Sequence, residues 1–368
     1  MNLLHGRVRE VGIISIISII IFSNGLLFYL QNSIEDDLKK GVFDQQKQLQ
    51  IQSTKEIAQH VQSDVGLVMS MLYGLANSGE VQSGNLGDDK TRKLLQDTFD
   101  AYNLTIDRLF ILDKNDSLVA SVTHSAEFFL GEDFSFRNWV KETKDILAPV
   151  FSGEFERAGI FRVFITYPII SKETGQYLGM IVTSIPTVPF FAHYGNVEHI
   201  ETQFLVAYDR NGTMLANGAS KTFVGKNFFG NYAQDFIKQN QALNNLTRNL
   251  LAGSSGYAIY DYGKGERLTT AYPILVNSKP QFFIEVVTPT SEIYSKINNV
   301  LSVQRVRMFS IFAAASTIAI IVLVVLLRKW NVILRREVKR RTQELEESYQ
   351  EIKTYLDKVL KEVKKQRQ

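Results

Sequence analysis

The sequence predicts an α+β fold with a long N-terminal helix, two tandem modules built on antiparallel sheets, two transmembrane helices and a C-terminal coiled-coil helix. Three observations lead to this prediction. Two long apolar runs without a charged residue, Val11–Leu30 and Phe309–Leu327, bracket a mostly polar segment. Within that segment, the same series of strand and turn patterns occurs twice. From Thr290 to Gln368, no Gly or Pro interrupts a helical pattern.

Each apolar run is long enough to cross a membrane as a helix, because the hydrocarbon core is about 30 Å thick. Arg7 and Arg9 precede the first run, and a dense basic cluster follows the second. Basic residues beside membrane helices stay in the cytoplasm. Both termini are therefore predicted to be cytoplasmic, and residues 31–308 extracytoplasmic, in a multi-pass protein of the cell membrane. The basic cluster consists of Arg328, Lys329, Arg335, Arg336, Lys339, Arg340 and Arg341.

A cleaved signal peptide is the alternative interpretation of the first apolar run. The run is longer than the apolar part of such peptides, and no small-x-small cleavage site follows it.

The composition also narrows the class of protein. The net charge of +3 is close to neutral and the basic excess lies beside the membrane, so no nucleic-acid partner is expected. The chain has no cysteine, which excludes disulfides and thiolate metal sites.

The first helix is predicted to continue well beyond the membrane. From residue 31 to about residue 77, apolar residues recur at steps of three and four, which is typical of an amphipathic helix. A segment rich in Gly, Ser and Asn interrupts the pattern at Asn77–Asp88, and a short helix is predicted over Asp89–Tyr102. The apolar positions of the long helix are Ile57, Val61, Val65, Val68, Leu72 and Leu75.

A strand–turn–strand pattern follows and occurs again later in the chain. Arg108–Asp113 and Ser117–Val122 are predicted to form a hairpin, and Gln203–Asp209 and Thr213–Asn217 form its second copy. Further patterns keep the same order in both copies, which favours duplication of one module over chance recurrence in a β-rich chain. Each copy is predicted to be an antiparallel sheet with helices on one side. The further pairs are Leu130–Phe134 with Val224–Phe228, Phe164–Ile169 with Thr269–Ile274, and Tyr177–Ser184 with Gln281–Thr288.

The segment after the second apolar run has a seven-residue repeat, which predicts a parallel dimeric coiled coil. A solvated charged helix is the alternative, because charged residues surround the repeat. The repeat follows two neighbouring seams of the predicted helix. The first seam is Val338, Leu345, Ile352 and Val359, and the second is Thr342, Tyr349, Leu356 and Val363.

These patterns divide the chain into predicted segments. Residues 1–10 form a cytoplasmic N-terminus, 11–30 the first transmembrane helix, 31–308 the extracytoplasmic domain, 309–327 the second transmembrane helix and 328–368 the cytoplasmic coiled coil. Within the extracytoplasmic domain, residues 31–88 hold the long helix, 89–185 the distal module, 186–289 the proximal module and 290–308 an exit helix.

The order of these elements resembles that of a double Cache sensor, and the resemblance covers about residues 31–308. It implies that both sheet modules are PAS-like and that the distal module binds a small molecule. Such sensors are common in histidine kinases, chemoreceptors and diguanylate cyclases of prokaryotes. The resemblance therefore implies a transmembrane receptor that senses a molecule outside the cell and signals inward.

One short segment resembles the ligand-binding part of family members that bind amino acids. Those members carry Tyr-x4-Arg-x-Trp-Tyr in the distal module, followed by a further Tyr and an Asp. Here Phe136–Val140 supplies the Arg-x-Trp, but Glu132 replaces the first Tyr and Ser184 stands at the position of the Asp. The resemblance implies Arg137 and Trp139 as ligand contacts and does not imply specificity for amino acids.

The residue types support the same prediction independently. An Arg two positions from a Trp can hold a carboxylate through two hydrogen bonds beside an aromatic wall, so the predicted ligand is a small molecule that carries a carboxylate. The alternative is that Arg137 lies on the surface and Trp139 packs in the core. Tyr167, on the alternating strand Phe161–Tyr167, is a further candidate ligand contact, and a packed tyrosine is its alternative.

The chain shows no catalytic motif, so we do not expect it to be an enzyme by itself or to need a cofactor. None of its 5 histidines follows the second apolar run, and a phosphoacceptor histidine is therefore missing. The output is expected from a cytoplasmic kinase or cyclase, either encoded beyond Gln368 or recruited by the coiled coil. A membrane tether that binds no ligand is the remaining alternative.

Overall fold

The computed structural model describes the chain except residues 1, 103–104, 124–128, 154, 158, 196–201 and 367–368. It divides into two compact units. We call Leu38–Ile297 the sheet unit, and Met1–Asp37 together with Asn298–Gln368 the helical unit.

A single helix, α1 (Asn2–Ala76), contributes to both units. In the sheet unit the predicted apolar positions of α1 are buried, including Val61, Val65 and Leu72 at 0% exposure. This confirms the amphipathic stripe predicted from the spacing of these residues. A helix with such a stripe is stabilised mainly by burying it against a partner surface.

The distal module contains one antiparallel sheet with strand order β2-β1-β6-β5-β3, and β4 also pairs with β5. Its central strands, β6 and β5, are long and largely apolar, as expected for strands covered on both faces. The elements of the module are α2 (Gly79–Gln82), α3 (Asp89–Tyr102), β1 (Arg108–Asp113), β2 (Leu118–Thr123), α4 (Asn138–Ile146), β3 (Val150–Phe151), β4 (Phe155–Arg157), β5 (Ile160–Ile170) and β6 (Tyr177–Pro186).

The proximal module has a second antiparallel sheet, with strand order β8-β7-β11-β10-β9. In both sheets the last strand of the module lies between the first strand and the preceding long strand, so the two modules share one topology. The elements are α5 (Thr187–Tyr194), β7 (Phe204–Tyr208), β8 (Met214–Asn217), η1 (Lys221–Phe223), α6 (Asn231–Phe236), α7 (Gln241–Leu251), β9 (Gly256–Tyr260), β10 (Arg267–Val276) and β11 (Lys279–Pro289).

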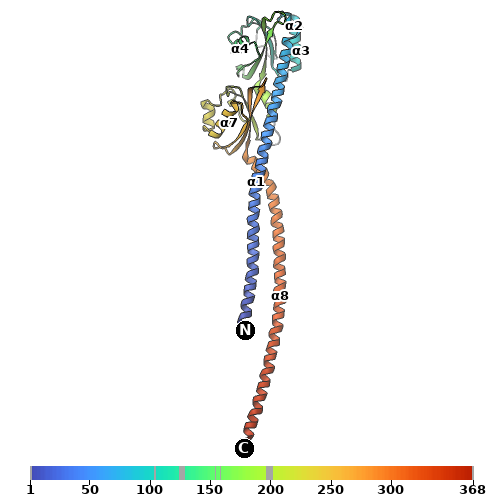
Figure 1. The fold of residues 1–368 in the computed structure, drawn as a ribbon, viewed down its shortest axis with the longest axis vertical. Helices are drawn as coiled ribbons and strands as arrows, with labels where there is room; N and C mark the ends of the chain where they lie inside the picture. The colour runs from blue at the N-terminus through green and yellow to red at the C-terminus, as the bar shows by residue number, and fades with distance from the viewer. Residues whose placement is uncertain are drawn as a thin grey trace. The chain divides into compact units, whose positions relative to one another are not determined.

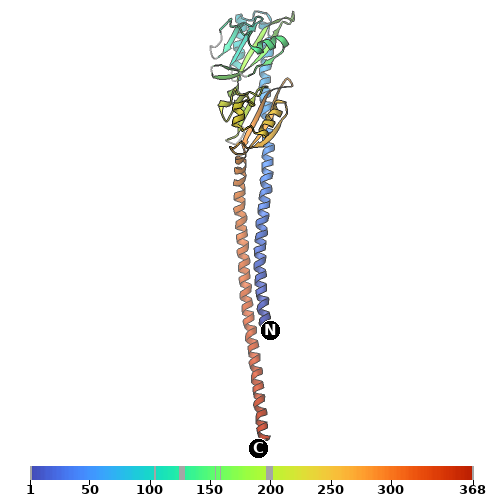
Figure 2. The same ribbon diagram turned by 90° about the vertical axis from the view of Figure 1, so that its left-hand side faces the viewer.

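Helices cover both faces of each sheet. Helix α1 lies along one face of the two sheets, while α4 and α7 lie on the opposite faces (Figures 1 and 2). The core on the α1 side is continuous from the distal to the proximal sheet. Phe282 of β11 joins the modules there, because its ring packs edge-on against Phe151 of β3 at 5.7 Å and against Phe191 of α5 at 6.2 Å.

Polar side chains of α1 also bind the proximal sheet. The Gln50 amide donates to the Val286 carbonyl at 2.9 Å and to the Leu268 carbonyl at 3.3 Å. The hydroxyls of Thr54 and Thr270 share a hydrogen bond of 2.6 Å. Since Gln50 and Thr54 are buried, these bonds fix the register of α1 against β10 and β11.

The helical unit consists of the first part of α1 and most of α8 (Thr290–Gln366). Glu35 forms an ion pair with Arg305, and the Ser316 hydroxyl donates to Asn24 Oδ1 at 3.4 Å. Among the described residues, one helix, α8, is long and apolar enough to cross a membrane. Val11–Leu30, the first predicted transmembrane segment, lies within α1, and many of its side chains fall outside the described residues.

Candidate functional site

The structure places the two predicted contacts of the Arg-x-Trp segment in different surroundings. Arg137 precedes α4 with an extended backbone, and its guanidinium lies 4.6 Å from the ring centroid of the exposed Phe136. Trp139 is 8% exposed and stacks on Phe164 of β5 at 5.3 Å. Trp139 therefore belongs to the packed interior of the distal module, whereas Arg137 lies nearer its surface.

The third predicted contact, Tyr167, lies on the other face of the distal sheet. Its ring packs edge-on against Tyr73 of α1 at 6.1 Å, and burial raises the pKa of its hydroxyl. Thr166, the neighbouring residue in β5, shares a hydrogen bond with Thr143 of α4 on the opposite face. The structure thus does not bring Tyr167 together with Trp139, and the roles of the three residues in ligand binding stay predictions.

The space between α4 and the distal sheet is filled by aromatic rings. Phe110 lies 5.6 Å from Phe134 and 6.3 Å from Phe164, and Trp139 completes the cluster. Together with aliphatic side chains these rings form one buried core cluster. Such packing is typical of a hydrophobic core rather than of a preformed ligand site.

The corresponding space in the proximal module contains a cavity of about 380 Å³. Side chains of β7, β8, β10 and β11 line it from the sheet, and α6 and α7 lie opposite. A largely apolar lining with a few polar groups is typical of a small-molecule site of this size. The aromatic lining residues are Phe204, Tyr208, Phe223, Phe228, Tyr232, Phe236, Tyr260 and Tyr262.

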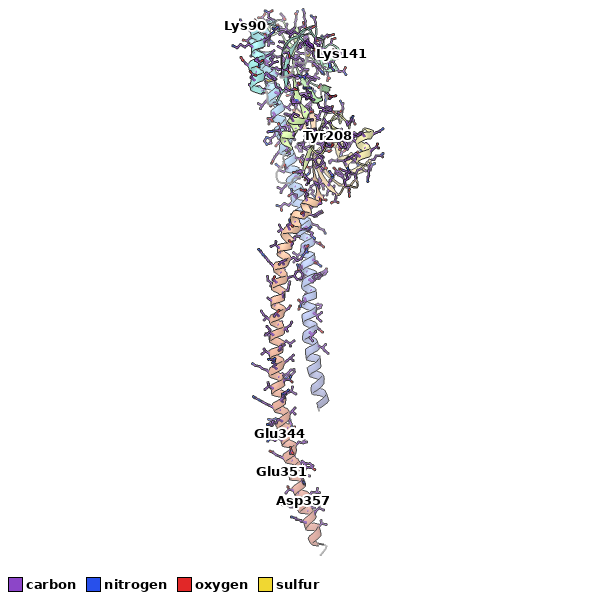
Figure 3. All side chains as sticks on the ribbon, turned by 180° about the vertical axis from the view of Figure 1, so that it is seen from behind. Lys90, Lys141, Tyr208, Glu344, Glu351 and Asp357 are labelled. Atoms are coloured by element: carbon purple, nitrogen blue, oxygen red, sulfur yellow. The ribbon has the colours of Figure 1, made fainter. Side chains whose placement is uncertain are left out.

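Glu285 of β11 is the buried acid of this cavity. The side chain is 2% exposed and is held at both oxygens, because the Tyr208 hydroxyl donates to Oε2 at 2.9 Å and the Thr247 hydroxyl donates to Oε1 at 2.8 Å. Burial raises the pKa of Glu285 to about 7, although the two hydrogen bonds favour the ionised form. Tyr208, labelled in Figure 3, belongs to β7 of the same sheet.

Two cations also line the cavity. The Arg267 guanidinium lies 5.1 Å from the ring centroid of Tyr262 and 5.8 Å from that of Phe204, and the Lys264 amine lies 4.2 Å from that of Phe236. The Nε atom of Arg267 is buried and has no hydrogen-bond partner among the described residues. Buried polar groups are normally hydrogen-bonded, so this atom marks a place where a ligand group could bind.

The sequence contained a signal for this cavity that the prediction did not use. Glu285 interrupts the apolar strand Phe282–Val287. When the two copies are aligned by their paired patterns, Glu285 corresponds to an apolar residue of the first copy. A charged residue in a strand covered on both faces requires a specific partner or a specific role.

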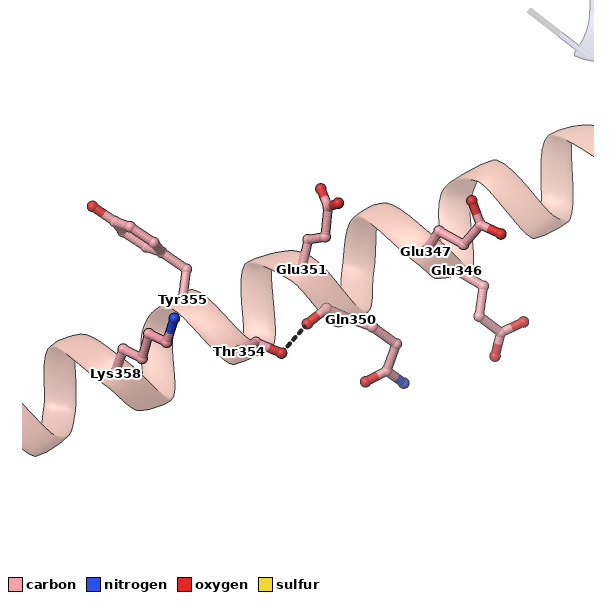
Figure 4. Close-up of a pocket in the computed structure, with 7 residues that line it drawn as sticks. All are labelled: Glu346, Glu347, Gln350, Glu351, Thr354, Tyr355 and Lys358. Carbon is pink, nitrogen blue, oxygen red and sulfur yellow. Dashed lines mark hydrogen bonds between the residues drawn. The ribbon is translucent and has the colours of Figure 1, made fainter.

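A second hollow follows the surface of α8 (Figure 4). All of its lining residues belong to this one helix, and the Thr354 hydroxyl donates to the carbonyl of Gln350 within it. Because a single helix lines this hollow, it does not enclose a ligand.

Fold and site together describe two tandem modules of one topology, the second of which contains a cavity. Residues 70–186 match the family model described as "HK/GC/Chemotaxis protein-like, sensor domain". A comparison with curated proteins found no significant match. Solved structures of extracellular sensor and ligand-binding domains do match, and they show that the sheet-bearing part of the chain has a double Cache-like fold.

Three of these solved structures illustrate the likeness. The periplasmic sensory domain of the Campylobacter jejuni chemoreceptor Tlp1 has a TM-score of 0.53 at 14% identity and covers 69% of this chain and 98% of its own. The ligand-binding domain of the Pseudomonas aeruginosa amino acid chemoreceptor PctB, in complex with L-Arg, has a TM-score of 0.52 at 13% identity and covers 68% and 90%. An extracellular ligand-binding receptor from Desulfohalobium retbaense has a TM-score of 0.51 at 15% identity and covers 65% of this chain but only 40% of its own.

Proposed function

We propose that the protein is a transmembrane signal-transduction receptor that binds a small molecule in its sheet unit, outside the cytoplasm, and signals to the cytoplasm through α8. In this proposal both apolar runs cross the membrane and both termini are cytoplasmic. PctB, which has a similar fold, binds L-Arg and L-Gln in its solved structures, and this supports small-molecule sensing as the input.

The direct continuation of β11 into α8 is the observation that carries the proposal. β11 ends at Pro289 and α8 begins at Thr290. The amide and the hydroxyl of Thr290 both donate to the Glu266 carbonyl, at 3.0 and 3.1 Å, which fixes the start of α8 beside β10. Since β11 also carries Glu285, a change in the proximal module can act on α8 without an intervening loop.

The cytoplasmic end of α8 supports a dimeric output. Leu345 is 76% exposed and Leu356 is 56% exposed in the single chain, although both lie at core positions of the seven-residue repeat. Pairing of two chains would bury this stripe, as in a parallel coiled coil. A kinase or cyclase would then act on the dimer, either as a further domain of this polypeptide or as a separate protein. In one alternative, the chain is the sensor portion of a histidine kinase or diguanylate cyclase. In a second alternative, it is a membrane tether that binds no ligand.

A Gly-Pro pair inserted after Lys329 should uncouple the coiled coil from the sheet unit and leave ligand binding intact. A Pro inside a helix costs about 3 kcal/mol and a Gly about 1 kcal/mol, so the pair should break α8. A spin label on Leu356→Cys, in a chain that has no native cysteine, reports the distance between the two helices of the dimer. We expect a ligand identified by thermal-shift screening to change this distance in the parent chain but not in the variant.

An insertion of seven helix-forming residues at the same place is the matched control, because it preserves the register of the repeat. It should retain the change in distance. If the Gly-Pro variant responded to the ligand like its parent, a continuous helical path would not carry the signal.

A further inference from the structure

The sheet registers allow the two modules to be compared residue by residue. In the distal sheet Val182 of β6 faces Phe110 of β1 and Thr166 of β5. In the proximal sheet Glu285 of β11 faces Val206 of β7 and Ala271 of β10. Val182 and Glu285 therefore occupy matching places, as do Phe110 and Val206.

This comparison explains why the proximal interior has room for a ligand. Phe110 and Phe164 fill the distal interior with their rings. Val206, the proximal residue that matches Phe110, lines the cavity. A small side chain in place of a large aromatic ring opens space that the surrounding chain does not fill. The cavity thus results from the side chains at these positions and not from a different fold.

The same comparison shows that an arginine paired with a carboxylate in the distal module has no such partner among the described residues of the proximal module. Arg162 of the distal module pairs with Asp107 at 2.6 Å. Arg267 matches Arg162, but Gln203 stands at the place of Asp107, and its amide donates to the Thr288 hydroxyl at 2.9 Å instead. Among the described residues no carboxylate lies within ion-pair distance of Arg267, and its Nε is an unpaired buried donor.

We propose that the proximal cavity binds a small organic monocarboxylate with an apolar body, and that Arg267 holds the carboxylate. A guanidinium and a carboxylate form two parallel charge-assisted hydrogen bonds, which would satisfy Nε. Lys264 adds a second positive charge, and aromatic rings surround the rest of the ligand. Glu285 disfavours a second carboxylate at the far side of the ligand. This proposal concerns binding and does not depend on signal transmission through α8.

Calorimetric titration and thermal shift of the full chain in detergent test the proposal with matched probes. Phenylacetate carries a carboxylate on an apolar body, as the proposal requires. Phenylacetamide has a neutral amide in place of the carboxylate, and phenethylamine has a positively charged amine. Hexanoate tests whether an aliphatic body suffices. We expect at least one of the two acids to bind and to raise the unfolding temperature, and the amide and the amine to bind at least tenfold more weakly.

Three variants locate the site. Arg267→Gln should weaken binding of the acid at least tenfold. Gln203→Asp should have the same effect, because it gives Arg267 an internal carboxylate partner. Val206→Phe should abolish binding by placing the distal ring in the cavity; circular dichroism without ligand verifies that it folds. Arg248→Gln is the matched control, because Arg248 is an exposed arginine of the same module that lies 5.8 Å from the ring centroid of Phe229, and it should bind the acid normally.

Several results would overturn the proposal. These are equal affinity in Arg267→Gln and the parent chain, equal or tighter binding of the amide or the amine, and no binding of either acid by the parent chain. Loss of binding in Arg137→Ala with normal binding in Arg267→Gln would place the site in the distal module instead. If Arg267→Gln failed to fold, Gln203→Asp and Val206→Phe would decide the question.

Discussion

Replacement of Asp107 by Ala should lower the free energy of unfolding by about 3 kcal/mol. The Arg162 side chain is 1% exposed and donates from Nε to Asp107 Oδ2 at 2.6 Å, while the Ser184 hydroxyl donates to Oδ1 at 2.5 Å. Removal of one member of a buried ion pair costs roughly 3–5 kcal/mol, because the other charge stays buried. We expect the lower end of this range, since the Asp107 side chain is 21% exposed.

Thermal unfolding of the full chain measures the effect, and Asp44→Ala is its control. Asp44 pairs with Lys47 at 2.7 Å, but its side chain is 64% exposed. An exposed pair of this kind contributes less than about 1 kcal/mol. Asp107→Asn keeps an acceptor for the Ser184 hydroxyl, so its free energy of unfolding should lie between those of Asp107→Ala and Asp44→Ala. If Asp107→Ala were as stable as Asp44→Ala, the Arg162 pair would not stabilise the distal module.

Much of the fold could be predicted from the sequence because its main elements carry local signals. The three- and four-residue spacing along α1 follows from its one buried face, and the β-rich apolar runs of β1 and β6 follow from burial in a sheet. The paired patterns then indicated that one module occurs twice, and the two sheets do share a strand order. Family resemblance added the expected class of sensor, which the comparisons support.

The site could not be predicted in the same way, because it depends on side-chain volume across a sheet. Sequence reasoning chose the distal module on the basis of Arg137 and Trp139. In the structure Trp139 stacks on Phe164, a partner that lies far from it in sequence. The cavity of the proximal module depends in the same way on Val206, whose small size becomes informative only after the strands are paired.

The pH dependence of stability should depend strongly on Glu285. Burial raises its pKa from 4.5 to about 7 in the folded chain. Between these two values the folded chain holds a proton that the unfolded chain has released, so stability must fall as pH rises through this window. The loss should be complete above pH 7 and amount to roughly 3 kcal/mol, because one pKa unit corresponds to about 1.4 kcal/mol.

Glu285→Gln should remove this dependence, because the amide keeps the size of the side chain without its charge. The measurement is the unfolding temperature of the full chain at pH 5 and pH 8. We expect the parent chain to lose stability relative to Glu285→Gln between these values, and Glu80→Gln, which alters an exposed acid of α2, to follow the parent chain. An identical pH profile for Glu285→Gln and the parent chain would contradict the prediction. Because Glu285 lies on the strand that leads into α8, the same titration would place a proton-dependent change at the start of the proposed signal path.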